Sequence, residues 1–272
     1  MSSLRKPPSL LNKQRIEGHL WLAADIHLGP HAPKTAAAFY AFLTRAAREA
    51  DALILCGDIF EAWIGDDVIF QPSPWLQEAI AAFRQCSAQI PLFLMRGNRD
   101  FLLGNAFARH IQAQWLPDEV LIETAATTFL LAHGDQLCTQ DRGYQRYRAI
   151  VHHPWVQKLF LTLPLRLRAK IARSLRHRSQ NKPYHMMDDI HEPTALDWLQ
   201  QHDLTLLVHG HTHQPAIHLM DESNGRRRIV IPDWEYDHST PVRGGWLSLS
   251  TEGQLVLHQS SQATQICQLS SG

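Results

Sequence analysis

Five short polar segments carry residue types that bind divalent metal ions, and each one follows an apolar run. Their aspartates, histidines and single asparagine offer carboxylate oxygens, imidazole nitrogens and an amide oxygen, the donors that hard and borderline divalent cations accept. One segment alone proves little, because Gly-Asp and Asp-x-His are common in turns. All five together, each ending an apolar run, indicate a metal site. The candidate ligands are Asp25, His27, Asp58, Asn98, His133, His211 and His213.

The spacing of these residues is compatible with two metal ions. Asp25 and His27 are two residues apart, so both can reach one ion from the end of a strand. The two carboxylate oxygens of Asp58 can bridge two cations, and His213 can turn back to the first of them. Two cations about 3.5–4 Å apart clamp a phosphoryl oxygen and lower the pKa of a bound water, which attacks phosphorus. The sequence therefore predicts a two-metal enzyme.

The elements that must position these residues alternate between strand and helix in the first half of the chain. Apolar runs predict strands, and a 3.6-residue periodicity predicts helices. The alternation predicts a mainly parallel sheet, whose carboxyl edge is where α/β proteins gather their sites. Strands are expected over 19–25, 52–56, 91–95, 120–123 and 127–132, and helices over 35–50, 74–88 and 101–110.

The second half of the chain no longer alternates regularly between strand and helix. Residues 141–200 have mostly helical periodicity, broken by prolines, and strands resume after them. We therefore expect one α/β (α+β) domain over 19–260, with a helical insertion at about 141–200, a loosely ordered N-terminal arm (1–18) and a C-terminal tail (261–272). The later strands are expected over 205–208, 216–220, 227–231, 246–250 and 254–258, the last four as a β meander.

The composition indicates the cellular compartment and the kind of partner. The chain has 272 residues, and its four cysteines are scattered without a C-x-x-C pair, which favours reduced thiols in the cytoplasm. The sequence offers neither the apolar core of a signal peptide nor the roughly 18 consecutive apolar residues of a membrane span. Of the 26 Lys and Arg, eleven lie between Arg142 and Met187, a segment without Asp or Glu. This asymmetry predicts an anionic partner.

The basic segment is also unusually apolar between Trp155 and Leu175. A helix after Pro164 would place its leucines on one side and most of its cationic residues on the other, although Arg168 falls on the apolar face. One interpretation is a cap that shelters lipid tails and docks on an anionic membrane surface. The alternative is a solvated basic helix that packs its leucines on the core.

The five segments together resemble the calcineurin-like metallophosphoesterase superfamily, whose pattern is D-x-H, G-D, G-N-H-[DE], H and G-H-x-H. The resemblance implies a metallophosphoesterase β-sandwich flanked by helices, here with a helical cap insertion. One departure concerns the third segment, because Arg99 replaces a histidine that is thought to protonate the leaving group in most members.

Longer motifs around these segments resemble one branch of that superfamily, the UDP-2,3-diacylglucosamine pyrophosphohydrolases. The motifs are residues 57–67, 96–101, 133–139, 141–148 and 209–215. The resemblance implies hydrolysis of that nucleotide lipid to UMP and the acylated sugar 1-phosphate of lipid A synthesis, with two manganese ions, at the inner face of the cytoplasmic membrane. Its implied ligand sets are Asp25, His27, Asp58 and His213 for one ion and Asp58, Asn98, His133 and His211 for the other.

The resemblance also implies contacts with the substrate. Asn98 and Arg99 would be catalytic residues that touch the phosphate, and the further substrate-binding residues would be Asp141, Ser179, Lys182 and His211. An arginine makes sense here because a sugar phosphate leaves as a stable anion, which a guanidinium can stabilise without donating a proton. The alternative is that Arg99 pairs with Asp100 or Asp135 and only shapes its loop.

Two other functions compete with this prediction. A general phosphodiesterase or protein phosphatase could use the same metal ligands, but Arg99 and the apolar basic cap argue against it. A non-catalytic protein that binds nucleic acid through its basic segment is disfavoured, because the segment lacks regularly spaced aromatic residues for base stacking.

Overall fold

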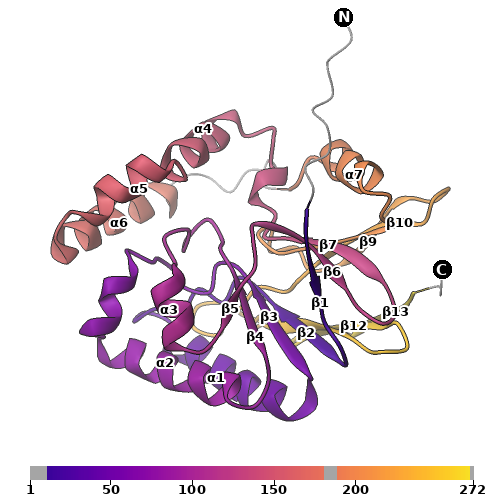
Figure 1. Cartoon of the computed structure of the whole chain (residues 1–272), viewed down its shortest axis with the longest axis horizontal. Coiled ribbons are helices and arrows are strands. Elements are labelled where there is room, and N and C mark those ends of the chain that lie inside the picture. Colours follow the sequence, from indigo (N-terminus) through magenta and orange to yellow (C-terminus); the bar gives the residue numbers. More distant parts are fainter. Residues whose placement is uncertain (1–10, 181–188, 270–272) are drawn as a thin grey trace, which may run out of the picture.

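The computed structural model describes residues 11–180 and 189–269, with the backbone alone described for 176–180. Two β-sheets pack face to face, and helices cover both outer faces (Figure 1). The predicted fold class, a β-sandwich flanked by helices with a helical insertion, is confirmed. Among the described residues, no helix combines the length and apolar character needed to cross a membrane.

The first sheet has seven strands in the order β13-β12-β11-β2-β3-β4-β5. Its strands β2 to β5 are parallel, and the other pairings are antiparallel. The bounds are β2 Leu20–Ala23, β3 Ala52–Cys56, β4 Leu92–Met95, β5 Gln114–Trp115, β11 Gly245–Leu249, β12 Gln254–Gln259 and β13 Gln265–Gln268.

The second sheet has six strands in the order β1-β6-β7-β8-β10-β9. β6 pairs antiparallel with β7 and β9 pairs antiparallel with β10, whereas the other neighbours are parallel. The bounds are β1 Asn12–Arg15, β6 Glu119–Glu123, β7 Thr128–Ala132, β8 Leu206–His209, β9 Ile217–Asp221 and β10 Arg226–Val230.

Successive side chains of a strand point to opposite faces of its sheet, which divides the core into layers. In β3, Leu53 and Leu55 pack under the helices, and Ile54 and Cys56 lie between the two sheets. Because both faces of such a strand are buried, it reads as a continuous apolar run. Leu130 of β7 likewise faces the helix on the far side of the second sheet. This packing fixes the strand register, and with it the direction of the residues that follow each strand.

Three helices cover the outer face of the seven-stranded sheet, and one covers the outer face of the other. Proline stands in the first turn of four helices, where its missing N–H costs no hydrogen bond. The bounds are α1 Pro33–Glu49, η1 Asp66–Phe70, α2 Pro74–Ser87, α3 Asn105–His110, η2 Asp135–Leu137, α4 Arg142–Val151, α5 Pro154–Leu161, α6 Leu165–Gln180 and α7 Glu192–Gln201.

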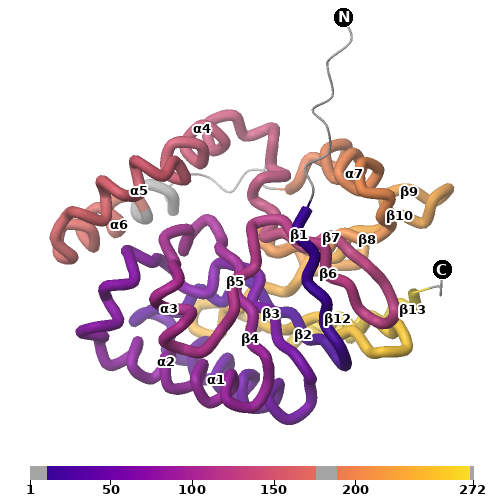
Figure 2. Tube along the Cα trace, in the orientation of Figure 1, coloured from indigo at the N-terminus to yellow at the C-terminus, as the bar shows by residue number. Residues whose placement is uncertain are grey.

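Helices α4, α5 and α6 form the insertion, which we call the cap. Figure 2 shows the chain leaving the sheets after β7, running out through the cap and returning through α7 to β8. Arg168 of α6 is buried and ties the cap to the loop around η1. Its guanidinium forms a two-pronged ion pair with Asp67, donates to the carbonyl oxygen of Ile64 at 2.6 Å and donates through Nε to that of Leu163 at 2.9 Å.

Three features differ from the expectation. Residues 12–15 of the expected arm form β1, and residues 265–268 of the expected tail form β13. Both are sheet-edge strands with polar or mixed side chains, so their pairing depends on backbone hydrogen bonds that no apolar pattern announces. The expected meander is wrong, because β9 and β10 join one sheet while β11 and β12 join the other.

Candidate metal centre

The seven candidate ligands converge where the carboxyl ends of the two sheets meet. Asp25 and His27 follow β2, Asp58 follows β3, and Asn98 follows β4, all in the seven-stranded sheet. The remaining three follow β7 and β8 of the other sheet. The centre therefore lies between the sheets, and each sheet supplies part of it.

Five of the seven have a left-handed backbone, which non-glycine residues rarely adopt. Their φ angles are 54° at Asp25, 55° at His27, 50° at Asp58, 69° at His211 and 52° at His213. Such conformations cost free energy and persist only where the surrounding structure imposes them. Their concentration at successive strand ends shows that the loops are shaped to aim these side chains at one point.

One group of donors consists of Asp25, His27 and His213, whose ligand atoms lie within 4.8 Å of one another. The two Nε2 atoms of His27 and His213 are 3.4 Å apart, and Nε2 of His213 is 3.5 Å from Oδ1 of Asp25. Asp25 is fully buried, and its Oδ1 accepts no hydrogen bond. A buried carboxylate oxygen without a donor is well suited to a cation.

A second group is built around Asn98. Its amide oxygen lies 3.1 Å from Nε2 of His133 and 2.9 Å from Nδ1 of His211. Nε2 of His133 is 3.7 Å from Oδ1 of Asp58, and Asp25, Asp58 and His133 also offer donor atoms within 4.8 Å of one another. Asp25 and Asp58 therefore connect the two groups, a donor arrangement that suits two neighbouring divalent cations.

Contacts on the far side of the rings favour the nitrogen that faces the centre. Nδ1 of His133 lies 2.9 Å from the carbonyl oxygen of Cys56, so it carries the proton and leaves Nε2 free to bind a metal. Nδ1 of His213 is 3.4 Å from Oδ2 of Asp233, and Nδ1 of His27 is 3.6 Å from the Glu61 carboxylate. Both carboxylates favour the same choice of Nε2 as the inward-facing donor.

Two glycines make room for the carboxylates. A Cβ added to Gly97 would collide with the carboxylate and backbone nitrogen of Asp58, and one added to Gly210 would collide with Oδ2 of Asp25. Because the colliding atoms belong to buried candidate ligands, neither can move aside without disturbing the centre. The glycine in the third and fifth sequence segments is thus a steric requirement.

The buried charges need a positive partner. Burial raises the pKa of Asp58 to about 7, and the nearby carboxylates of Asp100 and Asp25 add to the effect, while His133 opposes it. Burial lowers the pKa of His27 to about 3, assisted by the charge of His213, and burial lowers that of His211 to about 3. Neutral imidazoles and crowded carboxylates are the protonation states and charges that divalent cations select.

Arg99 lies beside this centre without an acidic partner from its own loop. Asp100 is buried and accepts hydrogen bonds from the backbone of Gly97 at 2.7 Å and Ile59 at 2.8 Å, so it holds the loop. In the described part of the chain, the Arg99 side chain forms no hydrogen bond or ion pair with Asp100 or Asp135. Its positive charge is close enough to lower the pKa of both Asp58 and His27.

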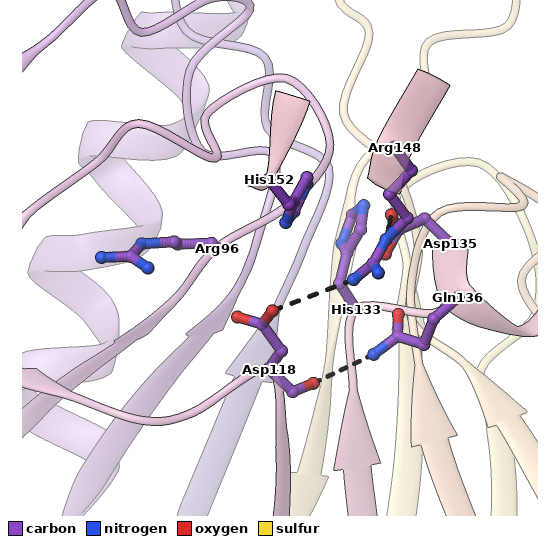
Figure 3. Close-up of a pocket in the computed structure, with 8 residues that line it drawn as sticks. Arg96, Asp118, His133, Asp135, Gln136, Arg148 and His152 are labelled. Carbon is purple, nitrogen blue, oxygen red and sulfur yellow. Dashed lines mark hydrogen bonds and ion pairs between the residues drawn. The ribbon is translucent and has the colours of Figure 1, made fainter. Parts of the chain in front are cut away.

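Asp135 instead connects the centre to the cap, a role that the sequence did not reveal. Its Oδ2 accepts a 2.7 Å hydrogen bond from Tyr144 and a 2.6 Å bond from Nε of Arg148. The Tyr144 ring also stacks on His211, with centroids 6.2 Å apart. Figure 3 shows Arg148 reaching toward Asp118 beside His133. The first turns of α4 are therefore fixed directly over one flank of the centre.

The proposed substrate residues outside the centre are only partly placed. Asp141 caps α4, because its Oδ1 accepts a 2.8 Å hydrogen bond from the backbone nitrogen of Tyr144. Ser179 belongs to the last turn of α6, where the backbone alone is described, and Lys182 lies outside the described residues. Asp233 near His213 had no motif to signal it, since the contact forms only when the loop after β10 folds back onto the centre.

Sequence comparison identifies the family. The model of the family described as calcineurin-like phosphoesterase matches residues 18–215. A UDP-2,3-diacylglucosamine hydrolase of Bordetella parapertussis is 45% identical over 247 residues, covering 89% of this chain and 96% of that protein. Proteins of the same name from Bordetella pertussis and Salmonella arizonae are 46% and 43% identical, covering 89% and 79% of this chain and 96% and 91% of their own. The chain belongs to the calcineurin-like phosphoesterase family, in the branch of the UDP-2,3-diacylglucosamine hydrolases, as its motifs predict.

Proposed function

We propose that the protein hydrolyses the pyrophosphate bond of UDP-2,3-diacylglucosamine, giving UMP and 2,3-diacylglucosamine 1-phosphate in lipid A biosynthesis. The observation that carries the proposal is the match to hydrolases named for this substrate, which extends over most of the chain, cap included. The donor cluster and Arg99 supply the chemistry that such a reaction needs.

We propose two Mn²⁺ ions as the cofactors, held by the two ligand sets that the sequence motifs imply. Mixed oxygen and nitrogen donors suit manganese, although iron, cobalt and zinc accept the same types. Bound divalent cations supply Lewis acidity and lower the pKa of a water that can attack phosphorus. The chain itself contributes the fixed directions of its ligand atoms, which the left-handed backbone at five positions enforces.

Asn98 and Arg99 then act on the diphosphate. The backbone nitrogen of Arg99 donates a 2.7 Å hydrogen bond to Oδ1 of Asp58, which anchors the residue at the centre. Its guanidinium remains free of the neighbouring Asp100 and Asp135 and can fork onto phosphate oxygens. As the bridging oxygen departs with the sugar phosphate, negative charge grows on that leaving group, and the guanidinium stabilises it.

The cap is suited to the acyl chains and to a membrane surface. Every described side chain of α4 and α5 retains contact with solvent, and Trp155 and Leu159 are 72% and 71% exposed. Lysine and arginine residues border these apolar side chains, as in helices that lie at the surface of anionic membranes. We infer peripheral attachment to the cytoplasmic side of the inner membrane. This exposure favours the lipid interpretation over a leucine stripe packed on the core.

The test is product analysis. Purified protein with Mn²⁺ is incubated with UDP-2,3-diacylglucosamine in detergent micelles, and UMP and the sugar 1-phosphate are quantified by mass spectrometry. The proposal predicts both products in equal amounts. Arg99→Ala should lose most of the activity with its metal content unchanged, whereas a metal-depleted Arg99 variant would count against its phosphate role. Efficient hydrolysis of p-nitrophenyl phosphodiesters without UMP formation would leave a general phosphodiesterase.

A further inference from the structure

The two flanks of the metal centre differ in what surrounds them. On one flank, His133 and His211 face the cap, through the stacking of Tyr144 and the cavity lined by Arg148 and His152 (Figure 3). On the other flank, His27 and His213 form part of the wall of a second pocket of about 130 Å³. No residue of α4, α5 or α6 is among the described residues that line this second pocket.

The second pocket borders the centre through His27 and His213 and has several charged and polar side chains in its wall. Its walls come from the loops after β2, β3, β8 and β10 and from the start of α1. They carry the carboxylates of Glu61, Asp233 and Glu235 and the imidazoles of His31 and His238.

Asp233, one of the carboxylates that line this pocket, has an oxygen atom without a hydrogen-bond partner. Asp233 is 2% exposed; its Oδ2 accepts a 2.9 Å hydrogen bond from Nε of Arg243 and lies 3.4 Å from Nδ1 of His213. Its Oδ1 is buried and has no hydrogen-bond partner. Because almost all buried polar atoms in proteins are satisfied, such an oxygen points to a ligand that donates a hydrogen bond.

We propose that this pocket binds the nucleoside of the substrate, its ribose and uracil, while the acylated sugar lies beneath the cap. The proposal rests on the proposed function. Ribose hydroxyls are hydrogen-bond donors that satisfy carboxylates, and imidazoles can donate to the uracil carbonyl oxygens. An acyl chain would place these charged side chains against hydrocarbon, and the negative charges of the carboxylates disfavour a further phosphate. The nucleoside therefore fits the flank with the second pocket, and the acylated sugar fits the flank beneath the cap.

The test measures the binding of each reaction product separately to the Mn²⁺-loaded protein by calorimetry. In the wild-type protein, 2′,3′-dideoxy-UMP, which lacks both ribose hydroxyls, should bind at least about tenfold more weakly than UMP. Ala32→Phe, which fills the pocket from its wall, should weaken UMP binding by a similar factor and leave the binding of 2,3-diacylglucosamine 1-phosphate unchanged. Ala149→Phe, on an exposed position of α4, serves as the matched control.

Equal binding of UMP and its dideoxy analogue, or no binding of UMP, would overturn the subsite, and neither result depends on a variant that folds. An Ala32→Phe protein with normal metal content that binds UMP like the wild type would also overturn it. If UMP binds and the analogue is discriminated, but UDP-2,3-diacylglucosamine is not cleaved, the subsite stands and the proposed function fails.

Discussion

The ion pair between Arg168 and Asp67 is expected to control how firmly the cap is attached. Asp67→Ala would leave the guanidinium of a side chain that is only 2% exposed without its counter-charge. Removing one partner of a buried pair costs about 3–5 kcal/mol. Because the Asp67 side chain is 43% exposed, water can enter the vacated space, and we expect about 2–3 kcal/mol.

The assay is hydrogen exchange of the amides in α6, followed by mass spectrometry. A loss of about 2–3 kcal/mol in local stability lowers exchange protection about 30- to 140-fold. Arg168→Met should also loosen α6, because the carbonyl oxygens of Ile64 and Leu163 lose their donor. The variant that combines Asp67→Ala and Arg168→Met should lose no more exchange protection in α6 than Arg168→Met alone, since it leaves no unpaired charge. Additive losses in the double variant, or unchanged exchange in Asp67→Ala, would refute this reasoning.

Three further outcomes are expected. Gly97→Ala should abolish stoichiometric metal binding, measured by elemental analysis, because its Cβ meets the Asp58 carboxylate; full occupancy would contradict the steric argument. Manganese binding at pH 7.5 should release protons, seen as a dependence of the calorimetric enthalpy on the buffer, and affinity should rise as pH approaches 9. The reason is the pKa of His133: burial lowers it, but Asp58 and the other carboxylates outweigh burial and raise it to about 9, so the metal must displace a proton from this ring. An enthalpy that does not depend on the buffer would contradict this proton release. Leu159→Glu should weaken binding to anionic vesicles, whereas Phe70→Glu, 79% exposed outside the cap, should leave it unchanged; equal effects would place the contact elsewhere.

The convergence of the candidate ligands was predictable from the sequence because it depends on strand ends alone. Once Ala52–Cys56 and Leu92–Met95 are parallel neighbours, Asp58 and Asn98 must follow at the same edge of the sheet. The apolar runs reveal those strands, because their two buried faces leave no room for polar residues. The family assignment followed from the same segments, since they keep both the ligand types and their order.

Other contacts depend on tertiary structure that local pattern does not encode. Asn12–Arg15 is polar throughout, so its place in the sheet came from backbone pairing with β6. Arg168 is a charged residue on the apolar face of its predicted helix. The structure explains its place there by its ion pair with Asp67, which lies about a hundred residues away in the chain. Asp233 reaches His213 only through the fold of the loop after β10. Residues of this kind cannot be recognised before the fold is known.

We propose that two metal ions, held by these seven residues, support the cleavage of UDP-2,3-diacylglucosamine. The decisive experiment titrates metal-free protein with Mn²⁺ and records bound metal and UMP formation on the same samples. We expect saturation at two ions per chain, with the rate of UMP formation reaching its maximum only with the second ion. Asn98→Ala should remove one ion and most of the activity. Full activity with one ion per chain, or two bound ions without UMP formation, would rule out a two-metal reaction on this substrate.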